Sequence, residues 1–170
     1  MNFISKLLGG LYFHKKPFWV IFDPELHKVK GLQVREILNS VEPGDILIRR
    51  VDGYLGSKLT PGYWSHAGLY IGGNEICHSI ASGVVYEDIL DFCRTDHICL
   101  AKVKASNLQK FEATERAREM EHEHLEYDFT FSDNNGKVYC TEFINLCYSG
   151  LFNSDYSMVA SVKHAFLPDD

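Results

Sequence analysis

Two histidines on either side of a glycine-rich turn place the strongest constraint on how this chain folds. His66 and His78 flank Gly72-Gly73-Asn74, and apolar residues run through both flanking segments, which is the pattern of a β-hairpin. With a three-residue loop, Gly68 pairs with His78, and both histidines point to the same face of the hairpin. Diagonal neighbours of this kind have Cα atoms about 7–8 Å apart, so their side chains can meet. A two-residue loop would send the histidines to opposite faces.

A cysteine opens a predicted helix in the last third of the chain. Turn residues Asn134-Asn135-Gly136 precede Cys140, and apolar residues then recur at helical spacing up to Gly150. The N-terminus of a helix carries about half a positive charge, which favours a thiolate over a thiol. Cys140 is therefore the candidate nucleophile, with His66 as its candidate base. The remaining cysteines, which are predicted to be small buried side chains, are Cys77, Cys93, Cys99 and Cys147.

Capping and turn residues predict further elements along the chain. Helices are expected up to Ser40 and from the capping box at Ser106 to about Leu125, and Asp88 should cap a helical turn. Strands are expected over residues 46–51 and 97–104. Residues 18–22 and 155–170 are compatible with strands or with arms.

Several short motifs also occur in a recognisable order. They are Pro43-Gly44-Asp45, Ser65-His66-Ala67-Gly68, the strand ending at His78, Tyr127-Asp128 and Tyr139-Cys140-Thr141-Glu142. In this order and spacing they resemble the permuted papain-like members of the NlpC superfamily, in particular the YiiX/YaeF-type amidases. A lecithin:retinol-acyltransferase-like branch shares the permuted order, in which the histidine precedes the cysteine. The resemblance covers about residues 42–150. It implies an α+β, circularly permuted papain-like fold, with a small, mostly antiparallel sheet packed against the nucleophile helix.

The resemblance also implies a Cys-His-His triad. By it, Cys140 is the nucleophile, His66 is the base, and His78 is the polar residue that orients His66. The third position is often an acid in amidase-like members and a histidine in the acyltransferase-like branch. The residues alone leave open that His78 is only a core histidine. The acids that would then take the third position are Glu75, Glu87 or Asp88.

Six further residues are predicted to bind the substrate or to support the nucleophile. Aromatic side chains could line a pocket, with core packing as the alternative, and acidic side chains could orient the backbone or the substrate, with capping of a local turn as the alternative. The six are Tyr63, Trp64, Ser65, Tyr139, Asp128 and Glu142.

Metal and cofactor binding are not predicted. A zinc site formed by Cys140, His66 and His78 is the alternative, but nothing in the sequence indicates the open geometry and the supporting residues of a catalytic zinc. His122 and His124 lie on a charged predicted helix, where a solvent-exposed face is the simpler interpretation. No cofactor is required by the predicted chemistry.

Charge and cysteine content limit the partners and the compartment. A net charge of −6 and a pI near 5.7 argue against nucleic acid as a partner, because phosphate binding needs a basic face. Five cysteines without a C-x-x-C pair argue against a disulfide framework. No signal peptide and no run of ~20 apolar residues is evident, so we predict a cytoplasmic protein.

The 170 residues are expected to form a single domain. Residues 1–41 are predicted as an N-terminal arm with helices, residues 42–150 as the catalytic core, and residues 151–170 as a C-terminal arm. Within residues 3–11, apolar side chains up to Leu11 share one face of a predicted helix. This face could make a peripheral membrane contact, or it could pack on the domain or on a second copy of the chain.

Three functions fit these observations. The first is a cysteine hydrolase that cleaves amide bonds, of the peptide or cell-wall type, through an acyl-enzyme. The second is a lipid acyltransferase or thioesterase of the lecithin:retinol-acyltransferase-like type, with a lipid-linked acyl substrate, which His78 and the apolar N-terminal face favour. The third is a non-catalytic binding module, against which the intact Cys140 and His66 argue.

Overall fold

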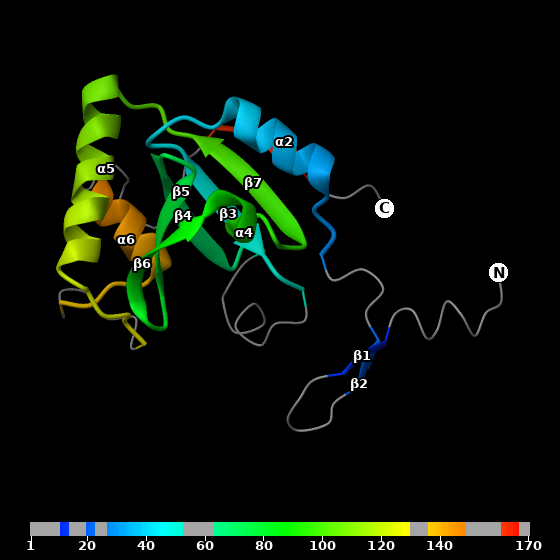
Figure 1. Ribbon diagram of the computed structural model, residues 1–170. Coiled ribbons are helices and arrows are strands. Elements are labelled where there is room, and N and C mark those ends of the chain that lie inside the picture. Colours follow the sequence, from blue (N-terminus) through cyan, green and yellow to red (C-terminus); the bar gives the residue numbers. More distant parts are fainter. Residues whose placement is uncertain are drawn as a thin grey trace.

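A six-stranded antiparallel sheet with helices on both faces forms the body of the protein (Figure 1). The computed structural model describes residues 11–13, 20–22, 27–52, 63–129, 136–148 and 161–166. In order across the sheet, the strands are β6 (Gly83–Asp88), β5 (Glu75–Ile80), β4 (His66–Gly72), β3 (Ile46–Arg50), β7 (His97–Lys102) and β8 (Ser161–Phe166). The helices are α2 (Gly31–Ser40), α4 (Ile89–Phe92), α5 (Asn107–His122) and α6 (Cys140–Cys147). The predicted α+β architecture is confirmed.

Strand alternation divides the core into two layers. On β3, Ile46 and Ile48 face the side covered by α5 and α6, whereas Leu47 faces the side covered by α2 and α4. The nucleophile helix α6 buries Phe143 and Ile144 in the first layer. Burial of these apolar surfaces is the main force that holds α6 against the sheet, as predicted.

The histidine hairpin, formed by β4 and β5, keeps the predicted register at two residue pairs, but the predicted pair of Gly68 with His78 does not form. Leu69 pairs with Cys77, and Tyr70 pairs with Ile76. These are the pairs that follow from a three-residue loop. The register therefore places His66 on the same face of the hairpin as its partner histidine.

The turn of this hairpin differs from the prediction. Gly72 pairs with Glu75, so only Gly73 and Asn74 form the turn, and the extra residue Ile71 is taken up in a β-bulge. Gly73 and Asn74 have φ values of 65° and 68°, the left-handed conformation that a two-residue type I′ turn requires. A two-residue turn is thus compatible with the residue pairs expected for a three-residue loop, because the bulge shifts the pairing by one residue.

Side-chain caps fix several helix starts where the sequence predicts them. Asp88 Oδ1 accepts the Leu90 N–H at 2.7 Å at the start of α4. Ser106 and Gln109 form the capping box of α5. This helix ends at His122, three residues before the predicted end.

A buried carboxylate joins β3 to its neighbours. Asp45 is fully buried and lies 2.6 Å from Lys102 Nζ on β7 and 3.0 Å from Lys110 Nζ on α5. Its Oδ2 also accepts the backbone N–H of Glu42 at 2.8 Å. A buried charge is tolerated only when it is paired in this way. Asp45 therefore fixes the start of β3, the strand beside the histidine hairpin.

The ends of the chain contribute two more strands, β1 and β2, and the edge strand β8 of the main sheet. β1 (Leu11–Phe13) pairs with β2 (Val20–Phe22) in a separate two-stranded sheet, and β8 pairs with β7 at the edge of the main sheet. The predicted N-terminal helical face does not extend to Leu11, because Leu11 pairs with Phe22 in this small sheet. The rest of that face, residues 3–8, lies outside the described residues. Gly150, which was predicted to mark the end of the helix that begins at Cys140, also lies outside them. Within the described parts of the chain, no helix is long and apolar enough to cross a membrane.

Candidate active site

Cys140 is the first residue of α6, as predicted, and its side chain is only partly exposed. Burial raises the pKa of the Cys140 thiol, and hydrogen bonds from the backbone N–H groups of Ala67, Thr141 and Cys140 itself lower it in part. The helix N-terminus thus points its N–H groups at the sulfur, but loss of hydration outweighs them. Burial thus reverses the lowering of the Cys140 pKa that the helix N-terminus predicts.

The sheet opens where Cys140 approaches it. Pairing of β4 with β5 begins at Leu69, so the preceding residue pairs of these two strands are not joined. Near this opening, Ser79 Oγ on β5 donates a hydrogen bond to the Val138 carbonyl at 2.6 Å, two residues before Cys140. The N–H of Ala67 then donates to Cys140 Sγ. The sulfur of Cys140 consequently lies near the start of β4, where His66 precedes Ala67.

The two histidines meet as the hairpin register predicts. His66 Nε2 lies 2.7 Å from His78 Nδ1, and the two rings meet edge to face with centroids 5.0 Å apart. The ring of Phe92 packs against both, with centroids 5.9 Å from His66 and 5.5 Å from His78. His78 is 1% exposed, so this contact is shielded from water. The pair occupies Nε2 of His66 and leaves its Nδ1 outside this contact.

Both histidines are neutral in this environment. Burial lowers the pKa of His66 well below its ordinary value of 6.5, and the nearby His78 and Arg49 lower it further. Burial, with a smaller contribution from the Arg49 cation, lowers the pKa of His78 to about 3. Between two neutral imidazoles, one of the facing nitrogens carries the shared proton and the other accepts it.

Acid is expected to destabilise the folded protein through His78. Below pH 6.5 the unfolded chain binds a proton at this residue, whereas the folded protein does so only near pH 3. The contribution of His78 to the free energy of unfolding is therefore complete above pH 6.5. It decreases as the pH is lowered below this value, by about 1.4 kcal/mol per pH unit. Urea unfolding at pH 7.5, 6 and 5 measures this slope. In His78→Gln the slope should be shallower by about that amount, while in the exposed control His122→Ala it should match the wild type. Equal slopes in all three proteins would contradict the prediction.

An ion pair lies directly behind His78. Glu87 Oε2 on β6 lies 3.4 Å from His78 Nε2 and 3.2 Å from Arg49 Nη1 on β3. The Arg49 guanidinium lies 4.0 Å from the centroid of the Phe92 ring and donates a hydrogen bond to the Phe92 carbonyl at 3.1 Å. Of the acids considered for the third catalytic position, Glu87 is thus the one beside the histidines. Asp88 caps α4 instead, and Glu75 is exposed at the turn.

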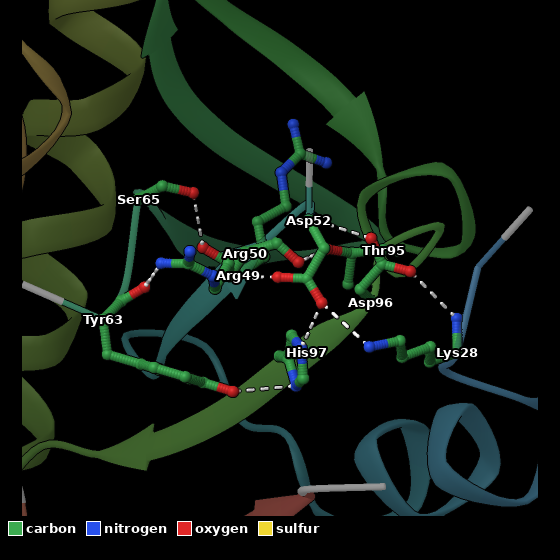
Figure 2. A network of polar contacts seen from close by, with 9 residues as sticks. All are labelled: Lys28, Arg49, Arg50, Asp52, Tyr63, Ser65, Thr95, Asp96 and His97. Atoms are coloured by element: carbon green, nitrogen blue, oxygen red, sulfur yellow. Dashed lines mark hydrogen bonds and ion pairs between the residues drawn. The ribbon is translucent and has the colours of Figure 1, made fainter. Parts of the chain in front are cut away.

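A second polar network includes two of the predicted substrate-binding residues, Tyr63 and Ser65 (Figure 2). The Tyr63 hydroxyl lies 2.9 Å from His97 Nδ1, and His97 Nε2 lies 2.8 Å from Asp52 Oδ2. Trp64 packs edge-on against Tyr63 with ring centroids 5.1 Å apart, and Ser65 donates its N–H to the Arg49 carbonyl at 3.3 Å. The hydroxyl of Tyr63 is therefore engaged by His97.

Asp52 is the electrostatic centre of this network. A hydrogen bond from Lys28, followed by one from His97, holds the pKa of the Asp52 carboxyl well below its usual range. Lys28 Nζ and Arg50 Nε lie 2.9 and 3.0 Å from its two oxygens. The sequence analysis did not identify Asp52 or His97, because they are 45 residues apart and carry no motif.

The remaining predicted residues lie around the start of α6. Tyr139 is the N-cap residue of the helix, and Glu142 is an acid in its first turn. Asp128 is 1% exposed, and its N–H donates to the Val138 carbonyl at 3.3 Å. Tyr127 was not among the predicted site residues. Burial raises the pKa of the Tyr127 hydroxyl, and the neighbouring Cys140 contributes, which places this ring near the nucleophile.

Comparison with known proteins agrees with this geometry. The family model described as permuted papain-like amidase enzyme, YaeF/YiiX, C92 family, matches residues 40–167. The chain therefore belongs to this family of permuted papain-like amidases. Membership supports an amidase-like or peptidase-like hydrolase.

A solved structure shares the fold. The crystal structure of the metalloprotein YiiX from Escherichia coli O157:H7 is similar, with a TM-score of 0.53 and 21% sequence identity. The similarity covers 64% of this chain and 64% of the YiiX chain. No curated protein matches the sequence significantly. The permuted papain-like fold expected from the sequence is confirmed.

Proposed function

We propose that this protein is a cysteine hydrolase that cleaves amide bonds through an acyl-enzyme on Cys140. The observation that carries the proposal is the position of Cys140 at the start of α6, where the N–H of Ala67, the residue after His66 on β4, points at its sulfur. His66 in turn is held through Nε2 by His78 at 2.7 Å. A nucleophile, a base and a residue that orients the base are the parts that covalent catalysis needs.

The reaction starts from a neutral pair. As Cys140 Sγ attacks the carbonyl carbon, its proton moves to Nδ1 of His66, so a charged thiolate need not exist beforehand. The C–N bond of the tetrahedral intermediate then breaks, and His66 gives this proton to the leaving amine. Water attacks the thioester with His66 as base. The acid leaves, and the thiol is restored, so that one amide and one water give one acid and one amine.

Backbone N–H groups at the start of α6 are suited to the intermediate. The N–H groups of Cys140 and Thr141 already point at the sulfur. A carbonyl oxygen bound beside the sulfur becomes an oxyanion during attack, and N–H groups fixed in place stabilise it at no cost in reorganisation.

No step of this mechanism passes through a metal ion. YiiX of Escherichia coli is described as a metalloprotein. In the described parts of the present chain, no group of three or more His, Cys, Asp or Glu side chains is arranged to hold a metal ion. The facing nitrogens of His66 and His78 are joined by a hydrogen bond, and the chemistry above uses side chains of the protein alone.

Transfer of an acyl group from lipid is the second candidate. The third catalytic position is held by His78, which is the residue type found there in the acyltransferase-like branch, and this observation favours the alternative. The same Cys140 thioester would form, but a second nucleophile instead of water would resolve it. A peripheral membrane contact through residues 3–11 would support this route.

Iodoacetamide is expected to label Cys140 at least about tenfold faster than any other cysteine at pH 7.5. Burial raises the pKa of Cys77 and Cys93 to about 12 and that of Cys99 to about 11, and Cys147 is equally enclosed. Cys140 is the partly exposed thiol and has a base beside it. Peptide mass spectrometry after timed labelling gives each rate.

Cys140→Ser is the matched control, since it should lose the fast label and keep the slow ones. Equal labelling of all five thiols would refute a catalytic Cys140 and leave a binding module on a papain-like fold. Incubation with dipeptide amides and, separately, with phosphatidylcholine vesicles tests the two routes. A Cys140 thioester detected only with the vesicles would favour the lipid acyltransferase.

A further inference from the structure

A proton on His78 Nε2, the ring nitrogen that faces away from His66, needs a hydrogen-bond acceptor. His78 Nε2 and Glu87 Oε2 are both buried and lie 3.4 Å apart, and neither has a well-directed hydrogen bond. A buried ring nitrogen without a partner costs free energy. A contraction of a few tenths of an ångström would join these two atoms. The carboxylate of Glu87 is therefore the natural acceptor for a proton on His78 Nε2.

Sheet register explains why Glu87 stands there. β5 pairs with β6 so that His78 lies opposite Val85 and Ile76 lies opposite Glu87. Side chains two residues apart on a strand share a face, so Glu87 is the diagonal neighbour of His78. A position in regular secondary structure holds such a contact more precisely than a loop would.

We propose that Glu87 is a positioning residue for the catalytic histidines: its carboxylate keeps the proton of His78 on Nε2. His78 Nδ1 then accepts a hydrogen bond from His66 Nε2–H, and His66 Nδ1 keeps the lone pair that receives the proton of Cys140. This inference rests on the proposed function. It adds a fourth side chain, which contacts His78, the third member of the Cys-His-His triad.

The opposite proton position would disable the base. With its proton on Nδ1, His78 would donate to His66 Nε2, and the proton of a neutral His66 would then sit on Nδ1. In that state His66 offers no lone pair to Cys140, as in a catalytic triad whose histidine is held in the wrong tautomer. The position of one proton on His78 thus decides whether His66 can act.

Among the described residues, Arg49 is the charged group in contact with Glu87. Arg49 on β3 lies 3.2 Å from the same oxygen, Nη1 to Oε2, and its side chain is 18% exposed. The guanidinium cannot accept a proton, so it competes for the carboxylate only as a donor. At the C-cap of α4, burial raises the pKa of Cys93 to about 12, so that thiol adds no charge. Arg49 consequently fixes the carboxylate that His78 needs.

Glu87→Gln changes this arrangement without changing its shape. Because Arg49 can only donate, the amide oxygen of Gln should turn to Arg49, and the amide NH₂ should then face His78 Nε2. The amide donates to that nitrogen and moves the proton of His78 to Nδ1. We expect the rate of Cys140 labelling by iodoacetamide at pH 7.5 to fall about 10- to 100-fold. Glu87→Asp, which restores the charge, should recover part of the rate.

Glu75→Gln is the matched control, because it removes the same charge from an exposed residue of β5. Its labelling rate should equal that of the wild type. If His66→Ala slows labelling but Glu87→Gln does not, the role of Glu87 is refuted while the proposed function stands. If neither variant slows labelling, the proposed function fails as well.

Proton positions can also be measured without a variant. Long-range ¹H–¹⁵N NMR spectra of the ¹⁵N-labelled wild type distinguish a protonated Nε2 from a protonated Nδ1, and His78→Gln assigns the signals. We expect His78 and His66 both to carry their proton on Nε2, and Glu87→Gln to move that of His78. A wild-type His78 protonated on Nδ1 would overturn the proposal, whether or not Glu87→Gln folds.

Discussion

His66→Ala is expected to lower the rate of 4-nitrophenyl acetate hydrolysis roughly 10²- to 10⁴-fold, the range measured when a general base is removed. This ester is activated, so it reports on the nucleophile without requiring recognition of the natural substrate. Burial raises the pKa of the Cys140 thiol, so we expect this thiol to depend on His66 to remove its proton during attack. Release of 4-nitrophenolate, followed by absorbance, measures the rate. The rate of the wild type should depend on the deprotonation of a base, and this part of the pH–rate profile should be missing in His66→Ala.

The matched control for this prediction is His122→Ala, which removes an exposed histidine at the end of α5. Its rate should stay within about twofold of the wild type, as for a surface change far from the site. A His66→Ala protein that remains folded by circular dichroism and hydrolyses the ester at the wild-type rate would exclude His66 as the base. Cys140 would then have to react without help from β4.

Asp45→Ala is expected to reduce the free energy of unfolding by about 2–4 kcal/mol. Asp45 is fully buried, and its loss leaves Lys102 and Lys110 without the carboxylate that holds them at 2.6 and 3.0 Å. Both lysines retain some access to water, with side chains 24% and 15% exposed, which reduces the cost below that of a completely enclosed charge. Urea unfolding followed by circular dichroism at pH 7.5 measures the difference.

Glu42→Gln provides the comparison, because Glu42 approaches the same two lysines from the surface, with its side chain 69% exposed. Exposed ion pairs contribute little, so we expect a change below about 1 kcal/mol. If both variants lost the same stability, the buried position of Asp45 would not matter. The start of β3 would then be held mainly by its apolar residues.

Most of the fold and the central contact of the site were predictable from local patterns. Strand alternation depends only on spacing along the chain, and it was enough to bring His66 and His78 to one face. Helix capping is also local, so the starts of α4, α5 and α6 followed from Asp88, Ser106 and the turn before Cys140. The order of these motifs led to the permuted papain-like family, which the family match confirms.

The parts that sequence reasoning missed depend on packing between distant segments. Glu87 reaches His78 only because β6 pairs with β5 in one particular register, and Arg49 comes from a third strand. The pKa of Cys140 was expected to be low from the helix N-terminus, but it is raised by burial, which only the packed site determines. The contact between Asp52 and His97 likewise joins residues 45 positions apart.

The bulge at Ile71 makes the two arms of the histidine hairpin unequal in their tolerance of altered length. Removing Ile71 would let Gly72 remain opposite Glu75 and Tyr70 opposite Ile76, so both histidines would keep their common face. The cost would be one core side chain, since Ile71 is 3% exposed. Removing a residue between Glu75 and Cys77 would instead turn His78 to the opposite side of the sheet. A deletion in this hairpin should therefore be placed at the bulge itself.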